Sequence, residues 1–238
     1  MATSVLRDCK LYYDGYDLSG DMNMLGINHG AAELDDTTFG ATTESRKGGL
    51  KQTSAAFKGL YQAGTNSVDA VLHPGVGANK VLSISPEAGA DGEVAFAFQA
   101  MHSKLMRGAS IGELLVIEGE ATAQGGTPLI RGRILHPAAT TVSGIGSGTG
   151  RQVGAVSATQ KLYASLHVLE VGTTVTVKVQ SDDNSAFTSA TDRITFTAAT
   201  AVGAQWSNVA GAVTDDWWRV NISAITGSAR FVVVAGII

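Results

Sequence analysis

Cysteine, proline, charge and long apolar runs are all scarce in this sequence. Among 238 residues one is cysteine and four are proline, and charged residues make up 16%. The lone Cys9 excludes an internal disulfide and is typical of synthesis in a reducing cytoplasm. No apolar run approaches the roughly 18 residues that cross a bilayer, and no charged-then-apolar leader opens the chain. We therefore expect neither a membrane segment nor export by a signal peptide.

Residue patterns that hold a metal or support catalysis are also missing. No two of the five histidines have zinc-ligand spacing; they are His29, His73, His102, His136 and His167. The run 182–184 lacks calcium-loop spacing and predicts a turn. Residues 108–112 read Gly-Ala-Ser-Ile-Gly, the hydrolase nucleophile pattern, but strand-like residues follow where that motif needs a helix, so a turn is predicted here too. We expect no enzymatic activity, no metal and no cofactor.

What the chain does contain is glycine and small or β-branched residues. Glycine accounts for 29 positions, and Ala, Thr, Val and Ser are plentiful, which is typical of strands joined by tight turns. Net charge is −4; residues 1–150 hold 15 acidic and 11 basic residues, and the remainder holds 6 of each. Without a basic run, tight binding of duplex DNA is not expected. The composition predicts a mainly β protein.

Apolar and alternating runs bounded by Gly or Pro predict the elements of the first half. Strands are expected over 5–13, 22–32, 50–61, 80–85, 93–102, 113–124 and 129–136. One short helix is expected over 66–73, capped by Asn66 and ended by Pro74-Gly75. Polar residues 33–48 predict an extended tip on a long hairpin arm, and a loop of this length usually carries function.

Two stretches of the first half have sequence patterns that resemble those of a known family. Tyr16-Asp-Leu-Ser-Gly20, followed by Glu-x-x-Asp-x-Thr-x-Gly-x-Thr and a basic pair with Gly-Leu within 32–51, resembles the major tail tube proteins of long-tailed bacteriophages over residues 12–62. The resemblance implies a tail-tube-like β-sandwich or barrel, rings of six copies stacked around a DNA channel, and contacts with other tail proteins. It also implies assembly in the host bacterial cytoplasm and a place in the virion tail.

Candidate contact residues follow from charge and alternation. The polar loop carries both charge signs, which favours ionic contacts to a neighbouring ring over an acid–base role; the residues are Glu33, Asp35, Asp36, Thr37, Phe39, Glu44, Arg46 and Lys47. On strand 113–124, period-two alternation puts Glu118, Glu120 and Thr122 on one polar face. That face could line the channel or lie outside, and we favour the channel because carboxylates repel phosphates.

The second half predicts another β unit. Gly, Ser and Thr dominate 141–152, which we interpret as a linker between a tail-tube-like domain, 1–140, and an accessory β-sandwich domain, 153–238. The second unit resembles sandwich modules attached to phage structural proteins. Strands are expected at 174–180, around 194–196, at 217–222 and at 231–235. Trp206 and Trp218 are candidate glycan-stacking or interface residues, so a carbohydrate-binding or adhesin-type protein is the alternative function.

Overall fold

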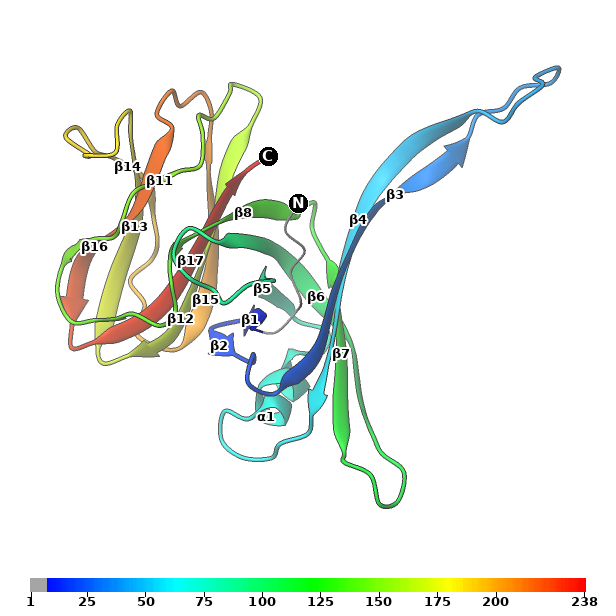
Figure 1. Ribbon diagram of the computed structural model, residues 1–238, viewed down its shortest axis with the longest axis horizontal. Coiled ribbons are helices and arrows are strands. Elements are labelled where there is room, and N and C mark those ends of the chain that lie inside the picture. The colour runs from blue at the N-terminus through cyan, green and yellow to red at the C-terminus, as the bar shows by residue number, and fades with distance from the viewer. Residues whose placement is uncertain (1–7) are drawn as a thin grey trace.

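The computed structural model describes residues 8–238 and is mainly β, with 58% of residues in strands and 3% in helix (Figure 1). The mainly β fold and the one short helix predicted from the sequence are confirmed. Of the first predicted strand, residues 5–7 lie outside the described residues. The elements of the first half are β1 Lys10–Tyr13, β2 Tyr16–Asp17, β3 Met22–Asp35, β4 Arg46–Leu60, α1 Val68–Leu72, the 3₁₀ turn η1 His73–Gly75, β5 Asn79–Ser85, β6 Val94–Gly108, β7 Val116–Ala123 and β8 Ile130–His136.

The elements of the second half are also strands. They are β9 Thr141–Val142, β10 Gly146–Ser147, β11 Arg151–Gln152, β12 Lys161–Val171, β13 Thr174–Asp182, β14 Thr191–Thr195, β15 Gly203–Ala210, β16 Trp217–Thr226 and β17 Ala229–Ile237. The strands expected at 174–180, 217–222 and 231–235 are therefore confirmed as parts of β13, β16 and β17.

Twelve strands form one large sheet that curls on itself. Its main path runs β15-β12-β17-β8-β6-β5-β1-β2, and β9 pairs with β17. The two ends of this path meet: a Cβ placed on Gly15, in the turn between β1 and β2, would lie 2.3 Å from the backbone nitrogen of Gly203 in β15. A buried cluster that includes Tyr12, Ile134 and Val232 fills the space inside the curl.

Strands β7, β4 and β3 extend the large sheet from the second half of β6. β6 pairs with β5 and β8 through its first half and with β7 through its second, and β4 then joins β7 to β3. We call the four-stranded part formed by residues 22–28, 54–60, 102–108 and 116–122 the plate. Beyond the plate, residues 29–53 leave the body as a hairpin, which we call the arm (Figure 1).

The arm predicted from the sequence is present, but its loop is shorter than expected. β3 continues to Asp35 and β4 begins at Arg46, so the connecting loop covers 36–45 instead of 33–48. The charged residues within 33–35 and 46–48 lie in paired strands, and both faces of the arm there are open to solvent. A strand with no buried face lacks the apolar alternation that identifies strands in a sequence.

Helix α1 begins later than predicted. Asn66, the expected N-cap, has φ +61° and precedes the helix, so the capping role assigned to it is wrong. Ser67 is the N-cap residue, and its hydroxyl donates to the Gly64 carbonyl at 2.9 Å instead of accepting a helical N–H. Asp69 in the first turn accepts from Arg107 of β6 at 2.5 Å, which ties the helix to the plate.

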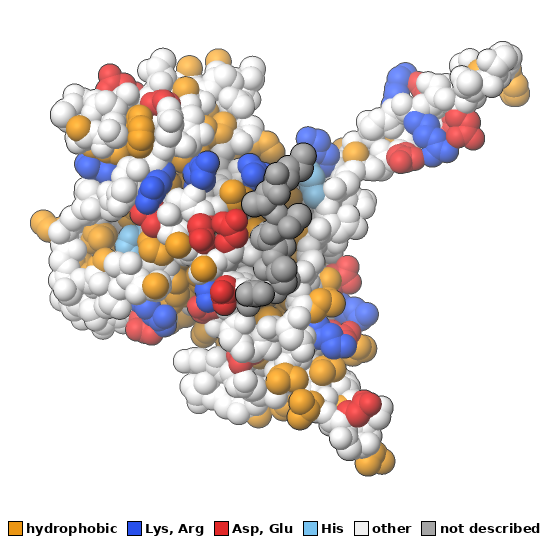
Figure 2. Space-filling model, in the orientation of Figure 1, with side chains coloured by type: hydrophobic (Ala, Val, Ile, Leu, Met, Phe, Trp, Pro, Cys, Tyr) orange, Lys and Arg blue, Asp and Glu red, His pale blue; other side chains and the backbone are white. Residues whose placement is uncertain are grey.

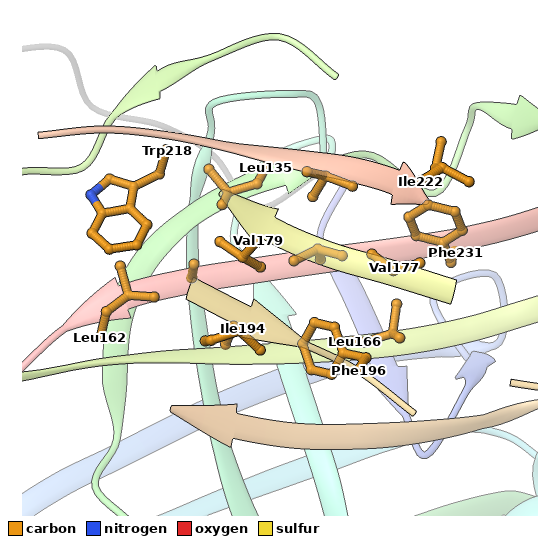
Figure 3. Close-up of a cluster of buried hydrophobic side chains, with 14 of the residues drawn as sticks. Leu135, Leu162, Leu166, Val177, Val179, Ile194, Phe196, Trp218, Ile222 and Phe231 are labelled. Atoms are coloured by element: carbon orange, nitrogen blue, oxygen red, sulfur yellow. The ribbon is translucent and has the colours of Figure 1, made fainter. Parts of the chain in front are cut away.

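The second half forms a two-layer sandwich. β12, β15 and β17 of the large sheet face a five-stranded sheet of order β10-β16-β13-β14, with β11 also on β16. Val177 and Val179 of β13 project inward and pack in one cluster with Leu166 and Phe231 of the large sheet (Figure 3). Alternation along β13 thus buries one face and leaves the other to solvent, as expected for an antiparallel strand. The second β-sandwich predicted from the sequence is present.

The large sheet crosses the segment predicted to be a linker. β17 pairs with β8, with Val233 opposite His136 and Val234 opposite Ile134. The segment 141–152 itself holds β9, β10 and β11, which pair with β17 and β16. The cluster inside the curl also combines Ile134 from the first half with Val232 from the second. Independent folding of the two parts was predicted from the sequence, but the shared sheet and shared cluster lead us to expect that the first part does not fold alone, and a truncation described below tests this.

Candidate assembly surfaces

The plate has one buried and one solvent-facing side. Ile117, Gly119 and Ala121 of β7 are buried, whereas Glu118 and Glu120 alternate with them and are partly exposed. Gly119 is required for this packing, because the Phe57 ring lies directly across it and a Cβ there would come within 2.2 Å of that ring. The alternation predicted for this strand is therefore present, and the assignment of its polar side to a channel stays a prediction.

Charges on the solvent side of the plate are balanced. Lys58 of β4 lies opposite Glu118 and forms an ion pair with it at 2.6 Å, and Lys104 of β6 lies opposite Glu120. The neighbouring positions are small or uncharged, and they border a shallow hollow of about 290 Å³ whose lining includes Asn28, Gly30, Gln52, Ser54 and Thr122. The face is consequently neutral, since each carboxylate predicted to line a channel has a lysine across the strand.

The two cations at the tip of the arm pair with carboxylates of the same arm. The Arg46 guanidinium contacts Glu33 at 2.6 Å and Glu44 at 2.7 Å, and Lys47 contacts Asp36 at 2.8 Å. Around the loop, the Ser45 backbone N–H donates to the Thr37 hydroxyl at 2.9 Å. Hydrogen bonds from Thr37 to Asp35 hold the pKa of Asp35 below its ordinary value. These contacts shape the tip within one copy and pair both of its cations, while its four carboxylates leave the tip with a net charge of −2 (two positive and four negative side chains).

Apolar side chains are exposed along the arm. Phe39 stands at the tip with its side chain fully accessible, and Leu34 and Leu50 are 54% and 85% exposed on the shaft. Figure 2 shows hydrophobic side chains at the far end of the arm, remote from the body. Large apolar groups that are clustered and exposed mark interaction surfaces. Phe39, predicted as a contact residue, is thus placed where a partner can reach it.

The turn between β6 and β7 is a second exposed apolar tip, which the sequence reasoning missed. Ile111 is fully accessible and Leu114 is 73% exposed. Gly112 has φ +88°, and the backbone N–H of Ser110 donates to Glu113 at 3.3 Å, which forms a turn without a helix after the serine. Among the described residues no histidine bonds to Ser110, so a turn is the correct interpretation of Gly-x-Ser-x-Gly. The presence of apolar residues within a Gly-bounded turn was the signal in the sequence that could have identified this exposed tip.

The two tryptophans do not form a shared platform. Trp218 is completely buried in the sandwich core, where its Nε1 donates to the Gly154 carbonyl at 2.8 Å. The proposal that Trp218 stacks on a glycan is therefore wrong, because neither face of its ring is accessible. Trp206 lies on β15, half-buried, with its ring centroid 5.7 Å from that of Tyr163. One face of Trp206 is already covered.

Buried histidines hold the curled sheet together. His167 of β12 is inaccessible; its Nε2 lies 2.9 Å from the Ser83 hydroxyl, and its Nδ1 accepts from the Gly15 N–H at 3.3 Å. Ser83 in turn lies 2.8 Å from Ser165. Burial lowers the pKa of His167 to about 3. If His167 were protonated, its Nδ1–H and the Gly15 N–H would be two donors facing each other. This histidine is therefore a neutral, structural residue of the core.

The carboxylate considered as a possible calcium ligand, Asp182, has a structural role instead. Both oxygens of the Asp182 carboxylate accept from loop groups, with the Ser189 N–H at 2.7 Å and the Asn184 amide at 2.9 Å. That aspartate therefore closes the β13–β14 turn. Within residues 8–238, no group of three metal-binding side chains gathers, and no helix is long and apolar enough to cross a membrane.

Comparisons with known proteins give structural similarities only. No family model matches the chain, and no curated protein is similar to it in sequence. A chain in the virion of a native gene transfer agent particle has 12% identity and a TM-score of 0.41, over 53% of this chain and 98% of that one. A chain in the tail of an empty gene transfer agent particle, refined with C6 symmetry, has 12% identity and a TM-score of 0.36, over 45% and 81%.

A third similar structure comes from a phage adsorption apparatus. The SPP1 Dit protein, described as a paradigm of the hub in phages that infect Gram-positive bacteria, has 8% identity and a TM-score of 0.37, over 98% of this chain and 100% of that one. With TM-scores below 0.5, these similarities do not assign a function to this chain.

Proposed function

We propose that this protein is a structural subunit of a virion tail, in which plates join edge to edge into rings and the rings stack into a tube that conducts DNA. One observation carries the proposal. β3 is a 14-residue edge strand that, among the described residues, pairs only with β4. Its outer row of backbone N–H and C=O groups has no strand partner, which is the arrangement that recruits a further strand.

The β3 edge also carries few of the features that protect edges from pairing. Its sequence, MNMLGINHGAAELD, contains no proline and no lysine, and its only charges, Glu33 and Asp35, lie at the far end. Soluble proteins usually interrupt such an edge with proline, a bulge or an inward lysine. β3 has register irregularities between Met22 and Met24 and between Ala31 and Glu33, but the eight residues 24–31 are in continuous register and contain neither proline nor lysine. This regular stretch supports pairing with another copy, and identical copies that pair head to tail close into a ring when the rotation permits it.

The width of the plate is compatible with six copies, the number implied by the tail tube resemblance. Six plates of four strands give 24 strands, and at about 4.8 Å per strand the wall is roughly 115 Å around and 37 Å across at the backbone. Side chains on the solvent side of the plate occupy part of that width. The grooves of duplex DNA are about 8 Å deep, which is consistent with a duplex roughly 20 Å in diameter. A duplex of that diameter would still pass through the channel.

The neutral face of the plate supports a DNA channel without DNA binding. Because Lys58 is paired with Glu118, and Lys104 lies opposite Glu120 in strand register, each lysine of the wall would have a carboxylate on the neighbouring strand that offsets its charge. Counterion release, which drives non-specific DNA binding, needs cations that are free to contact phosphates. The arm, with Phe39 at its tip, would reach a neighbouring ring, and the sandwich of β12–β17 would lie outside the tube.

Electron microscopy of matched edge variants tests this function. Asn28→Lys places a charge in the middle of the exposed β3 edge, and Asn208→Lys does the same on β15, the edge at the other end of the large sheet. We expect the native protein and Asn208→Lys to form tubes, and Asn28→Lys to stay monomeric with an unchanged melting temperature. Tubes from Asn28→Lys, or loss of tubes from Asn208→Lys alone, would contradict pairing through β3.

A further inference from the structure

An open apolar groove lies at the base of the arm, between β3 and strands β5, β6 and β8. It has a volume of about 590 Å³, and its apolar lining includes Leu25, Ile27, Ile84, Phe96 and Leu129. A second hollow of about 490 Å³ shares His29 and Leu129 with it and continues past Thr122 at the upper end of the plate. The combined groove is long enough for several residues of a partner, and it is lined mainly by side chains that favour an apolar one.

The groove is basic at its margins. Arg131 borders the first hollow and Lys51 the second, and among residues 8–238 no Asp or Glu side chain lines either. Neither cation forms a salt bridge among residues 8–238, in contrast to Arg46 and Lys47 at the arm tip. Figure 2 shows basic side chains beside the base of the arm. A partner for this groove should therefore be apolar with a negative charge.

The β6–β7 turn has this chemistry at the opposite end of the plate. Ile111 is fully accessible and Leu114 is 73% exposed, and Glu113 between them is the one charged residue of the segment 109–115. In Figure 1 this turn and the arm project from the plate in opposite directions. Figure 2 shows hydrophobic side chains with an acidic one at the end of this hairpin.

We propose that the β6–β7 turn of one copy docks in the groove at the arm base of a copy in the adjacent ring, with Ile111 and Leu114 in the apolar lining and Glu113 beside Lys51 or Arg131. This contact rests on the proposed function, because it needs stacked rings. Plates stacked end to end bring the turn, at the lower end of one plate, to Ser54 and Thr122, at the upper end of the next, where the groove lies.

The direction of the contact fixes how the tube grows. The turn and the groove are different surfaces, so their association is heterologous and leaves a free turn at one end and a free groove at the other. Such an interface repeats without limit along the tube axis. The plates are about 23 Å long, from seven paired residues at about 3.3 Å each. The arm strands, with seven residues in β3 and eight in β4, continue about 23–26 Å further, so each arm lies alongside the plate of the next ring.

Cysteine cross-linking tests the contact directly, because the one native cysteine, Cys9, lines the groove. Leu114→Cys in assembled tubes, treated with a short bis-maleimide, should link to Cys9 of another copy and give a ladder of oligomers on a denaturing gel. Burial raises the pKa of the Cys9 thiol, so the reaction is run at mildly alkaline pH. Leu114→Cys combined with Cys9→Ser should abolish the ladder, and Phe39→Cys should not produce it.

The same samples, viewed by electron microscopy, separate the possible failures. Tubes without a Leu114→Cys ladder would overturn the docking contact while leaving the tube function in place. A ladder from Phe39→Cys instead would assign the groove to the arm tip and overturn the proposal. Absence of tubes from the native protein would remove the proposed function, and the contact with it.

A second pair of variants measures the contribution of the turn. Leu114 and Ile145 are both 73% exposed, but Ile145 lies in the second half, away from the plate. Leu114→Asp should raise the concentration required for tube assembly by about tenfold or more, the effect typical of losing a buried interface anchor. Ile145→Asp should leave that concentration unchanged. Equal effects of the two substitutions would contradict the proposal.

Discussion

Replacing His167 with glutamine should make the stability of the protein less sensitive to acid. His167 is neutral in the fold because burial holds its pKa at about 3, against 6.5 for an ordinary histidine. The unfolded chain therefore takes up a proton on this side chain at a higher pH than the folded chain does. Stability from this group is fully present above pH 6.5 and is lost progressively as the pH falls toward 3.

The size of this effect follows from the two pKa values. Each pH unit between them is worth about 1.36 kcal/mol, so moving from neutral pH to pH 5 should lower the free energy of unfolding by about 2 kcal/mol through His167 alone. Burial also lowers the pKa of His102 and His136, which adds loss in the same direction. His167→Gln removes only the first contribution and leaves the other two as an internal reference.

Urea unfolding of both proteins at pH 7 and pH 5 measures the difference. At pH 7 the variant should be less stable by about 1–3 kcal/mol, because the groups that bonded the imidazole lose a partner. Between pH 7 and pH 5 the native protein should lose about 2 kcal/mol more than the variant. An equal loss in both proteins would show that His167 titrates normally and that the buried Gly15–His167–Ser83 network is absent in solution.

Four further outcomes are expected. A chain ending after Ser147 should fail to give a soluble folded protein, because Ile134 and its neighbours lose Val232 and Val234 at about 1.5–3 kcal/mol per buried side chain, against a total stability of about 5–15 kcal/mol; a cooperative unfolding transition would contradict this. Trp218→Ala should cost about 3–5 kcal/mol in urea unfolding, and a cost below about 1 kcal/mol would place that ring outside the core. Deleting 36–45 should leave the melting temperature almost unchanged but shorten tubes, since the loop contributes no buried side chain to the core; tubes of normal length would refute the arm contact. Glu118→Lys with Glu120→Lys should make assembled tubes retain duplex DNA at low salt and release it at high salt, and unaltered DNA passage would put that face outside the channel.

Antiparallel elements with one solvent-facing side were predictable from the sequence, as was the buried strand β17, whereas the central strand β12 was not. β13 and β7 alternate clearly, because one side of each faces solvent. β12 was not predicted, although it is 11 residues long, because it lies between β15 and β17 with a buried cluster on each face. Its apolar residues run together, and nothing in its pattern distinguishes a central strand from a short buried helix.

Contacts between distant segments limited what could be predicted of the candidate site. The acidic face of β7 was predictable, but its neutralisation was not, since Lys58 and Lys104 are far from Glu118 and Glu120 in sequence and meet them only through strand register. The same holds for the groove. Its lining combines β3, β5, β6 and β8, so no single stretch carries its signature. The exposed arm was predictable because its polar residues are contiguous.

The central claim is that plates pair through β3 into rings with the Glu118 face inward. An electron cryo-microscopy reconstruction of tubes assembled from the purified protein tests it most directly. The account predicts a continuous β wall in which β3 of each copy hydrogen-bonds to the plate of the next, with Lys58, Glu118 and Glu120 facing the channel. A tube whose wall is built from β15 edges or from the sandwich, with the Glu118 face on the outside, would contradict it.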